Sequence, residues 1–289
     1  MKTLRPLKSV EKLENATWLD AVANPMRDLV QAVIKPGAVR DILHGVPIGH
    51  PLHPLMVLVP TGTWLSAAVL DAVPGSKAAS AILIGTGVVS AAPTALSGWT
   101  DWSEGHEQQL RVGVVHAAAN AVAVGLYSLS LVQRLRGRSG KVLSYTGLAV
   151  VSAGGFLGGH MAYRQALGAN HSEDVPHRVE PGWHAIGALA ELPDGRLEKR
   201  VLGEVPLVVF RQGDEVSVLS ATCSHLSAPL DEGTVSYDDG DPCLTCPWHN
   251  SMFSLRNGEV LRGPATSPQP SFETRIVAGT VEVSLPNAG

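Results

Sequence analysis

The chain has 289 residues, a formal net charge of −4 and a mean hydropathy of +0.13, which is high for a water-soluble protein. This charge, and the absence of a dense stripe of lysine and arginine, argues against nucleic acid as a partner. The three cysteines, Cys223, Cys243 and Cys246, lie together in the C-terminal third. An odd number in so short a stretch does not suggest a secreted disulfide framework and favours a metal site.

Residues 1–46 are predicted to form an amphipathic or soluble segment ahead of a membrane domain. They have no uninterrupted apolar stretch and no twin arginine, so we do not expect a cleavable signal peptide. One interpretation is that the segment lies on a membrane surface, and the other is that it packs as a soluble helix against the rest. Apolar residues at helical spacing predict a helix interrupted near Pro25; they are Leu13, Trp18, Leu19, Val22, Met26, Leu29, Val30 and Val33.

Four apolar segments follow, at residues 54–73, 78–99, 112–132 and 143–163. Each is long enough to cross the hydrocarbon core of a membrane, which takes roughly 20 residues. The second has no charged residue, and glycine, alanine and serine inside the segments permit close helix packing. We therefore predict a four-helix transmembrane domain over residues 47–163. The alternative, a buried soluble bundle, is disfavoured by four uninterrupted segments with short connections.

Several histidines lie near the ends of these segments, and the order of the spans places them towards one face of the membrane: His50, His53, His106, His116 and His160. Ionisable residues in a membrane are costly and usually functional. Three interpretations remain open. The first is a haem b held between helices, with His53 or His50 on one side and His116 or His160 on the other. The second is a quinone or metal site using the same imidazoles. The third is a set of interfacial histidines that cap helices and bind loops.

GHPLHPLMVLVPTGTWLSAAVLDAV, at the first segment, and GGHMAY, at the end of the fourth, resemble an uncharacterised family of small four-helix bacterial membrane proteins. The resemblance implies no established activity. Asp71 belongs to the pattern of that family, and we expect it to pair with Lys77 or to cap a helix.

The polarity of the chain changes after the fourth segment. Residues 164–181 are polar and contain proline, which predicts a linker that allows the following domain to move. From Trp183 onward, short alternating runs such as LGEVPLVVFRQ and TRIVAGTVEVSL predict strands separated by turns. The predicted fold class is therefore multidomain, with an all-α transmembrane bundle followed by a small all-β antiparallel domain.

Two Cys-His pairs lie within this β domain, Cys223-x-His225 and Cys246-x-x-His249. Two soft thiolates and two imidazoles suit either zinc or a two-iron cluster. A zinc site would use Cys243 as well, together with Cys223, Cys246 and one histidine. Otherwise Cys243 is a bystander in a surface hairpin at residues 236–245.

From WHAIGALAELPDGRLEKRVLGEVPLVVFR through both pairs to TVEVSL, the sequence resembles the Rieske [2Fe-2S] family. The resemblance covers essentially the whole domain at residues 182–289. It implies a [2Fe-2S] cluster in which Cys223 and Cys246 bind one iron while His225 and His249 bind the other. Neutral imidazoles carry no negative charge, so they raise the potential of the iron that takes the electron.

Some positions depart from the high-potential members of that family, which carry an extra disulfide-forming cysteine in each loop. Ala228 and Trp248 stand where those cysteines are expected. Of two residues that donate hydrogen bonds and raise the potential, Ser251 is present, whereas Phe253 replaces a tyrosine. These differences imply a ferredoxin-type cluster of low to intermediate potential.

We therefore expect a membrane-anchored electron-transfer protein that exchanges electrons with a redox partner protein (a reductase or an acceptor). A haem b or a quinone in the bundle is a further expected partner, and membrane lipid surrounds the spans. About 40 residues follow His249, too few for the mononuclear iron domain of an oxygenase subunit. The chain is thus expected to be an electron carrier or a component of an oxidoreductase system, not a self-contained enzyme. The alternative is a membrane-anchored redox sensor or anchor protein with no cofactor in the bundle.

The orientation follows from two opposing signals. Arg134, Arg136, Arg138 and Lys141 between the third and fourth segments favour a cytoplasmic position for that connection. That orientation would require the basic N-terminal segment and the cluster domain to cross the membrane. Because iron–sulfur clusters are generally built in the cytoplasm, we expect both termini and the cluster domain on the cytoplasmic side of the bacterial cytoplasmic membrane.

Overall fold

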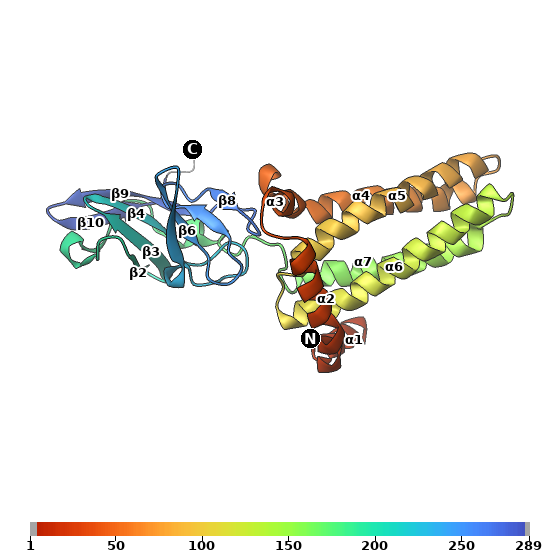
Figure 1. Cartoon of the computed structure of the whole chain (residues 1–289), viewed down its shortest axis with the longest axis horizontal. Coiled ribbons are helices and arrows are strands. Elements are labelled where there is room, and N and C mark those ends of the chain that lie inside the picture. Colours follow the sequence, from red (N-terminus) through yellow and green to blue (C-terminus); the bar gives the residue numbers. More distant parts are fainter. Residues whose placement is uncertain (1–4, 287–289) are drawn as a thin grey trace. The chain divides into compact units, whose positions relative to one another are not determined.

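The computed structural model describes residues 5–286, which form two compact units (Figure 1). The first unit comprises the residues up to Leu43 together with Pro51–Leu167. The second comprises His44–His50 and the residues from Gly168 onward. The first unit is helical, and the second consists mainly of antiparallel β-structure. The multidomain fold class predicted from the sequence is confirmed.

Four long helices make up most of the first unit: α4 (Leu52–Asp71), α5 (Lys77–Trp102), α6 (Glu107–Leu135) and α7 (Lys141–Tyr163). All four are long and apolar enough to cross a membrane. Helices α4 and α5 lie side by side, and so do α6 and α7, so the unit is built from two helical hairpins (Figure 1). The four helices coincide with the four predicted spans to within a few residues at most ends.

A proline inside α4 is accommodated by the neighbouring helix. Pro60 has no N–H to donate to the carbonyl of Met56 one turn earlier. The hydroxyl of Thr94 on α5 donates a hydrogen bond to that carbonyl, with an O–O distance of 3.4 Å. In a membrane such a carbonyl has no water to bind, so the interhelical bond satisfies it and fixes α4 against α5.

The end of the bundle at which α4 and α6 terminate holds a buried ion pair that the sequence did not predict. Asp71 pairs with Arg134 of α6, at 2.6 and 2.8 Å between guanidinium nitrogens and carboxylate oxygens, and not with Lys77. Ser80 Oγ donates to the same carboxylate at 2.7 Å. Helices α4 and α6 point the same way, so their C-terminal ends meet, and the forked guanidinium of Arg134 bridges them with two parallel bonds.

We expect Asp71→Asn to lower the free energy of unfolding by about 3 kcal/mol, because the buried guanidinium of Arg134 would lose its counter-ion. Thermal unfolding of the detergent-solubilised protein measures the change. The double variant Asp71→Asn/Arg134→Leu removes the unpaired charge and should recover much of the loss. Equal stability of wild type and Asp71→Asn would contradict a structural role for the pair.

The N-terminal segment consists of short helices: α1 (Arg5–Glu14), η1 (Thr17–Leu19), α2 (Asp20–Val33), α3 (Ala38–His44) and η2 (Val46–Ile48). The expected interruption near Pro25 is wrong, because α2 continues through it and the break falls at residues 15 and 16. One face of α2 packs on the bundle through Ala23, and Asp20 pairs with Arg111 of α6 at 2.7 Å. These contacts offset the hydrogen bond lost at the proline. A neighbouring face of α2 exposes the apolar side chains of Val22, Leu29 and Val33, and Trp18 of η1 is exposed as well.

The second unit contains two antiparallel sheets, with strand orders β1-β10-β9-β4-β3-β2 and β5-β6-β7-β8. The strands of the first sheet are β1 (His184–Ala188), β2 (Leu197–Leu202), β3 (Val205–Gln212), β4 (Glu215–Ser220), β9 (Ser271–Val277) and β10 (Thr280–Ser284). Those of the second are β5 (Thr234–Asp238), β6 (Asp241–Thr245), β7 (Met252–Ser254) and β8 (Val260–Arg262). Three short helices accompany them: α8 (Val175–Arg178), η3 (Leu189–Glu191) and η4 (Leu230–Glu232).

The expected linker is more ordered than its composition suggests. Its first residues belong to the helical unit, where Gln109 Nε2 donates to the carbonyl of Gln165 at 2.9 Å. Its later residues belong to the β unit, where Val175 is buried in an apolar cluster and the N–H of His171 donates to the carbonyl of Ser224 at 2.9 Å. After the fourth long helix, the boundary between the two units falls between Leu167 and Gly168.

Candidate metal centre

The two Cys-His pairs lie on two loops of similar construction. The first loop connects β4 to η4, and the second connects β6 to β7. In the first, the N–H of Cys223 donates to the carbonyl of Ala228 at 2.9 Å; in the second, the N–H of Cys246 donates to the carbonyl of Ser251 at 2.8 Å. The fourth residue after each cysteine, Ser227 or Asn250, has a positive φ near 60°. Each loop is thus a tight turn that closes on its own cysteine.

The structure brings the cysteines together and the histidines together. Cys223 and Cys246 are buried and their sulfur atoms share a hydrogen bond. The rings of His225 and His249 lie 5.0 Å apart, centre to centre, at an angle of 87°. His225 is buried and His249 is partly exposed. This arrangement sorts the four side chains into a sulfur pair and a nitrogen pair.

The two thiols of the sulfur pair have pKa values shifted in opposite directions. The hydrogen bond from Cys223 lowers the pKa of Cys246 to about 6, helped by the backbone N–H groups of Trp248 and His249. The hydrogen bond with Cys246, and burial, raise the pKa of Cys223. Cys246 is therefore the thiol that loses its proton more readily, and the thiolate is the form that binds a metal.

The separation of the imidazoles fits two ligands on one tetrahedral metal. A metal–nitrogen bond of about 2.0–2.1 Å, and roughly 1.1 Å from the nitrogen to the ring centre, put two tetrahedral imidazoles about 5 Å apart between centres. His225 and His249 match this value. With two adjacent sulfurs beside them, the four donors suit a cluster of two irons, one with sulfur ligands and one with nitrogen ligands.

A zinc site that includes Cys243 does not fit the geometry. Cys243 lies on β6 and its thiol donates to the carbonyl of Asp241, with a sulfur–oxygen distance of 3.3 Å. Nowhere within residues 5–286 do three or more cysteine, histidine, aspartate or glutamate side chains gather as a single metal ion would require. The β5–β6 hairpin spans residues 234–245 and includes residues 236–245, where the sequence predicted a hairpin.

A residue that the sequence analysis missed fastens the first loop. Gln269 is buried, and its side-chain oxygen accepts the N–H of Ser224 at 3.0 Å. Its amide nitrogen donates to the carbonyls of Ser220, at 2.9 Å, and Thr222. In addition, Ser224 Oγ donates to the carbonyl of Ser267 at 2.8 Å. The only sequence signal for this clamp is a polar residue between two prolines, in SPQPS.

Two further residues beside the sulfurs bear on the reduction potential. Ser251 is fully buried, and its hydroxyl oxygen accepts the N–H of Ala265 at 2.9 Å, which leaves the hydroxyl proton for another acceptor. Phe253 is fully buried in the apolar cluster that also contains Cys223 and Cys246. Its ring has no hydrogen to donate, so one of the two expected donors is missing.

The membrane histidines separate into different environments. His53 on α4 and His116 on α6 lie with ring centres 6.5 Å apart, at 84°. His160 on α7 instead pairs with Glu14 of α1, at 2.7 Å between Nε2 and Oε1. His50 is exposed ahead of α4, and His106 precedes α6. Of the candidates named from the sequence, the structure thus brings together His53 and His116.

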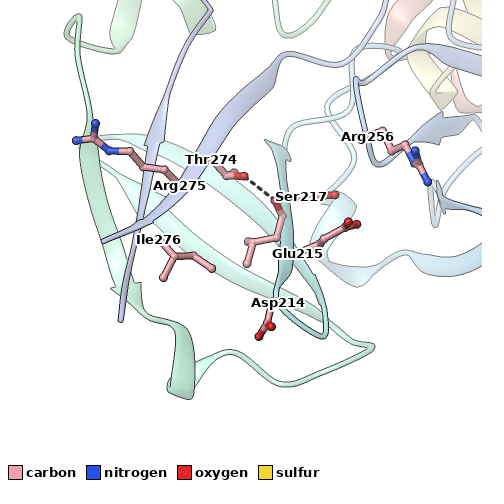
Figure 2. Close-up of a pocket in the computed structure, with 8 residues that line it drawn as sticks. Asp214, Glu215, Ser217, Arg256, Thr274, Arg275 and Ile276 are labelled. Carbon is pink, nitrogen blue, oxygen red and sulfur yellow. Dashed lines mark hydrogen bonds between the residues drawn. The ribbon is translucent and has the colours of Figure 1, made fainter. Parts of the chain in front are cut away.

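A pocket of about 420 Å³ lies elsewhere on the β unit, between the β3–β4 turn and β9 (Figure 2). Thr274 Oγ1 donates to the carbonyl of Val216 at 2.9 Å, the bond drawn dashed in Figure 2. The lining includes two acidic and two basic side chains. Its residues are Asp214, Glu215, Val216, Ser217, Arg256, Thr274, Arg275 and Ile276. None of them belongs to the loops that hold the two Cys-His pairs, so this pocket is separate from the metal centre.

Both halves of the chain match described families. Residues 182–273 match the Rieske [2Fe-2S] domain, and residues 49–171 match a family described as predicted membrane protein (DUF2231). All four side chains of the metal centre fall within the first match.

Individual relatives match the C-terminal part. The anthranilate 1,2-dioxygenase ferredoxin subunit of Burkholderia cepacia is 39% identical over 103 residues, covering 36% of this chain and 92% of that protein. Ferredoxin CarAc of Metapseudomonas resinovorans is 33% identical over 103 residues, covering 35% of this chain and 92% of that protein. A solved complex of reduced oxygenase and oxidized ferredoxin in carbazole 1,9a-dioxygenase matches at 32% identity and a TM-score of 0.32, covering 35% of this chain and 92% of that chain.

Proposed function

Because this chain belongs to the Rieske [2Fe-2S] family through its C-terminal domain, we propose that it is an electron carrier anchored in a membrane. The observation that carries the proposal is the sorted donor set, with two sulfurs in contact and two imidazoles 5.0 Å apart. The same chain contains four helices able to cross a membrane and a match to a membrane protein family.

The cluster supplies one reversible electron when it is bound. We propose Cys223 and Cys246 as the ligands of one iron and His225 and His249 as those of the other. The protein's part is to hold these side chains rigidly, to bury the sulfurs and to leave His249 accessible. Trp248, next to it, is 48% exposed, so this edge is where we place contact with a redox partner protein, either a reductase or an acceptor.

The location is part of the same proposal. We place the helices among the lipids of the bacterial cytoplasmic membrane, with the cluster domain on the cytoplasmic side. Domain boundaries follow the sequence analysis: residues 1–46, 47–163, 164–181 and 182–289. Cluster assembly in the cytoplasm supports this orientation, and the arginines between α6 and α7 oppose it.

We further propose that electrons pass between the cluster and a haem b or a quinone in the helical unit. His53 and His116 are the residues best suited to hold it. His50 and His160 are less suited, because His50 is exposed outside the helices and His160 binds Glu14. The alternative is a redox sensor or anchor with no cofactor in the bundle, in which case the cluster is the sole redox centre.

The test is low-temperature electron paramagnetic resonance of the full-length protein, purified in detergent from carbonate-washed membranes. After reduction we expect the rhombic signal of a cluster with mixed sulfur and nitrogen ligands. His249→Ala should abolish that signal, and Cys243→Ser should keep it. Zinc in place of iron, or recovery of the protein in the soluble fraction, would overturn the proposal.

A further inference from the structure

Three residues of α4 each pair with a residue of α6, and the spacing in the sequence is the same for all three pairs. Arg134 follows Asp71 by 63 positions, and the same spacing relates His116 to His53 and Tyr127 to Trp64. Each pair meets inside the bundle: the first as an ion pair, the second as rings 6.5 Å apart, and the third as stacked rings 4.2 Å apart. The two hairpins are therefore repeats that face one another in three layers.

The partner helix of each hairpin repeats as well. A methyl group added at Gly98 of α5 would lie 2.6 Å from the ring of His53, and one at Gly158 of α7 would lie 3.0 Å from the ring of His116. Both glycines thus form a notch that admits an imidazole. The same relation holds for Gly87 beneath Trp64 and Gly147 beneath Tyr127.

In two of the three layers the paired side chains interact directly with each other. Asp71 and Arg134 neutralise each other, and Trp64 and Tyr127 stack at an angle of 7°. The histidine layer differs, because its rings stand at 84° and do not stack. On α4 no residue before Pro60 is buried, and on α6 none between Gly113 and Ala123 is buried, within these fully described helices. On α4 and α6 the histidine layer is therefore less buried than the other two layers, whereas Thr94 of α5 and Gly154 of α7 beside it are buried.

The hydrogen bonds of both histidines fix the same tautomer. His53 Nδ1 lies 2.9 Å from the carbonyl oxygen of Thr94, and His116 Nδ1 lies 2.7 Å from that of Gly154. A carbonyl only accepts, so each Nδ1 carries the hydrogen, and each neutral ring keeps the Nε2 lone pair for a metal. The amide nitrogen of Asn120 is 3.3 and 3.2 Å from the two ring nitrogens of His116. These nearly equal distances place it over the ring face, not in line with the Nε2 lone pair.

The ring separation indicates how a metal would be bound. With metal–nitrogen bonds of about 2.0–2.1 Å, two imidazoles on opposite sides of one metal have ring centres about 6.3 Å apart, against about 5 Å for tetrahedral binding. His53 and His116 are 6.5 Å apart, whereas His225 and His249 of the same chain are 5.0 Å apart. The membrane pair thus matches opposed, axial ligands.

A metal held by two axial imidazoles needs other donors around its equator. No third cysteine, histidine, aspartate or glutamate joins the pair in the described part of the chain. The ligand must therefore bring its own equatorial nitrogens, as a porphyrin does. We propose that His53 and His116 are the axial ligands of a b-type haem held between the two hairpins.

The role of this haem as electron partner rests on the proposed function, whereas its binding does not. In that role the reduced cluster loses one electron and the ferric iron gains it, with no bond or proton transferred. Both axial positions would be filled by nitrogen, so the iron would be low-spin and closed to external ligands.

The experiment measures haem in the full-length protein, expressed with added haem precursor and purified in detergent. We expect one haem per chain, a sharp α band on reduction, and a low-field resonance from the nearly perpendicular imidazoles when oxidised. His53→Ala and His116→Ala should each lose the haem, whereas the matched variants His50→Ala and His160→Gln should keep it. His116→Met retains a ligating side chain and should keep the haem with a shifted α band, which distinguishes lost ligation from misfolding.

Haem absent from a protein with a full cluster would overturn the inference and leave the anchored carrier intact. Haem that persists in the double variant His53→Ala/His116→Ala would be adventitious and would equally overturn it. Conversely, bound haem beside a domain without a reducible cluster would defeat the proposed function and leave the axial pair standing.

Discussion

Replacing Gly258 with alanine will remove the cluster from most of the protein and lower the free energy of unfolding of the β unit by about 3 kcal/mol or more. Gly258 has a φ of +76°, and an added Cβ would overlap the carbonyl oxygen of Gln269. The Gly258 carbonyl also accepts the N–H of Gln269 at 2.8 Å. Relieving the overlap moves Gln269, which releases the first loop at Ser224.

The matched control is Gly203→Ala, at the turn between β2 and β3. Gly203 has a φ of +59°, and an added Cβ would meet no atom within 4 Å. That variant carries the backbone strain alone, about 1 kcal/mol, and should keep its cluster. Iron content and chemical denaturation separate the two effects. Equal iron in both variants would show that Gln269 does not position the loop.

Replacing Phe253 with tyrosine will raise the reduction potential of the cluster by about 65–130 mV. A new hydroxyl donor beside Cys246 stabilises the more negative, reduced state; one net hydrogen bond to a charged acceptor is worth about 1.5–3 kcal/mol, and about 59 mV corresponds to 1.4 kcal/mol for one electron. Phe253 is fully buried with both cysteines, so the hydroxyl has few other acceptors. A spectroscopic redox titration measures the shift.

Phe272→Tyr is the matched control for this prediction. Phe272 is also buried, but it lies in the other apolar cluster of the domain, which contains neither cysteine. We expect its potential to remain at the wild-type value. Ser251→Ala should shift the potential the opposite way, because it removes a hydroxyl that accepts the N–H of Ala265 and keeps its own proton for a further hydrogen bond. A lower or unchanged potential in Phe253→Tyr would contradict the assignment.

The elements whose signal lies within one contiguous stretch were predictable from the sequence. Apolar length alone located the four helices, and the two Cys-His pairs with their flanking strands indicated the candidate metal centre. These signals are contiguous in the chain, so a single stretch carries enough information. The identity of the four side chains fixed the donor chemistry, and the structure added how they pair.

The elements that depend on distant partners were not predictable. Lys77 is near Asp71 in sequence, yet Arg134 meets it in space because two parallel helices end together. From the sequence, His160 was as good a candidate ligand as His116. In the structure His160 pairs with Glu14 of α1. Gln269 gave no signal, because its role depends on a loop far away in the chain. The spacing shared by the three layers was present in the sequence, but only a comparison of α4 with α6 reveals it.

The two hairpins have the same architecture but different side chains, and joining them in one chain permits that difference. Two identical copies of a single hairpin would place histidine opposite histidine equally well. They would also set aspartate against aspartate, or arginine against arginine, at the far end, where Asp71 and Arg134 now neutralise each other. Covalent fusion lets the two halves diverge. One end then keeps a matched pair of histidines, His53 and His116, while the other acquires opposite charges that fix the register of the halves.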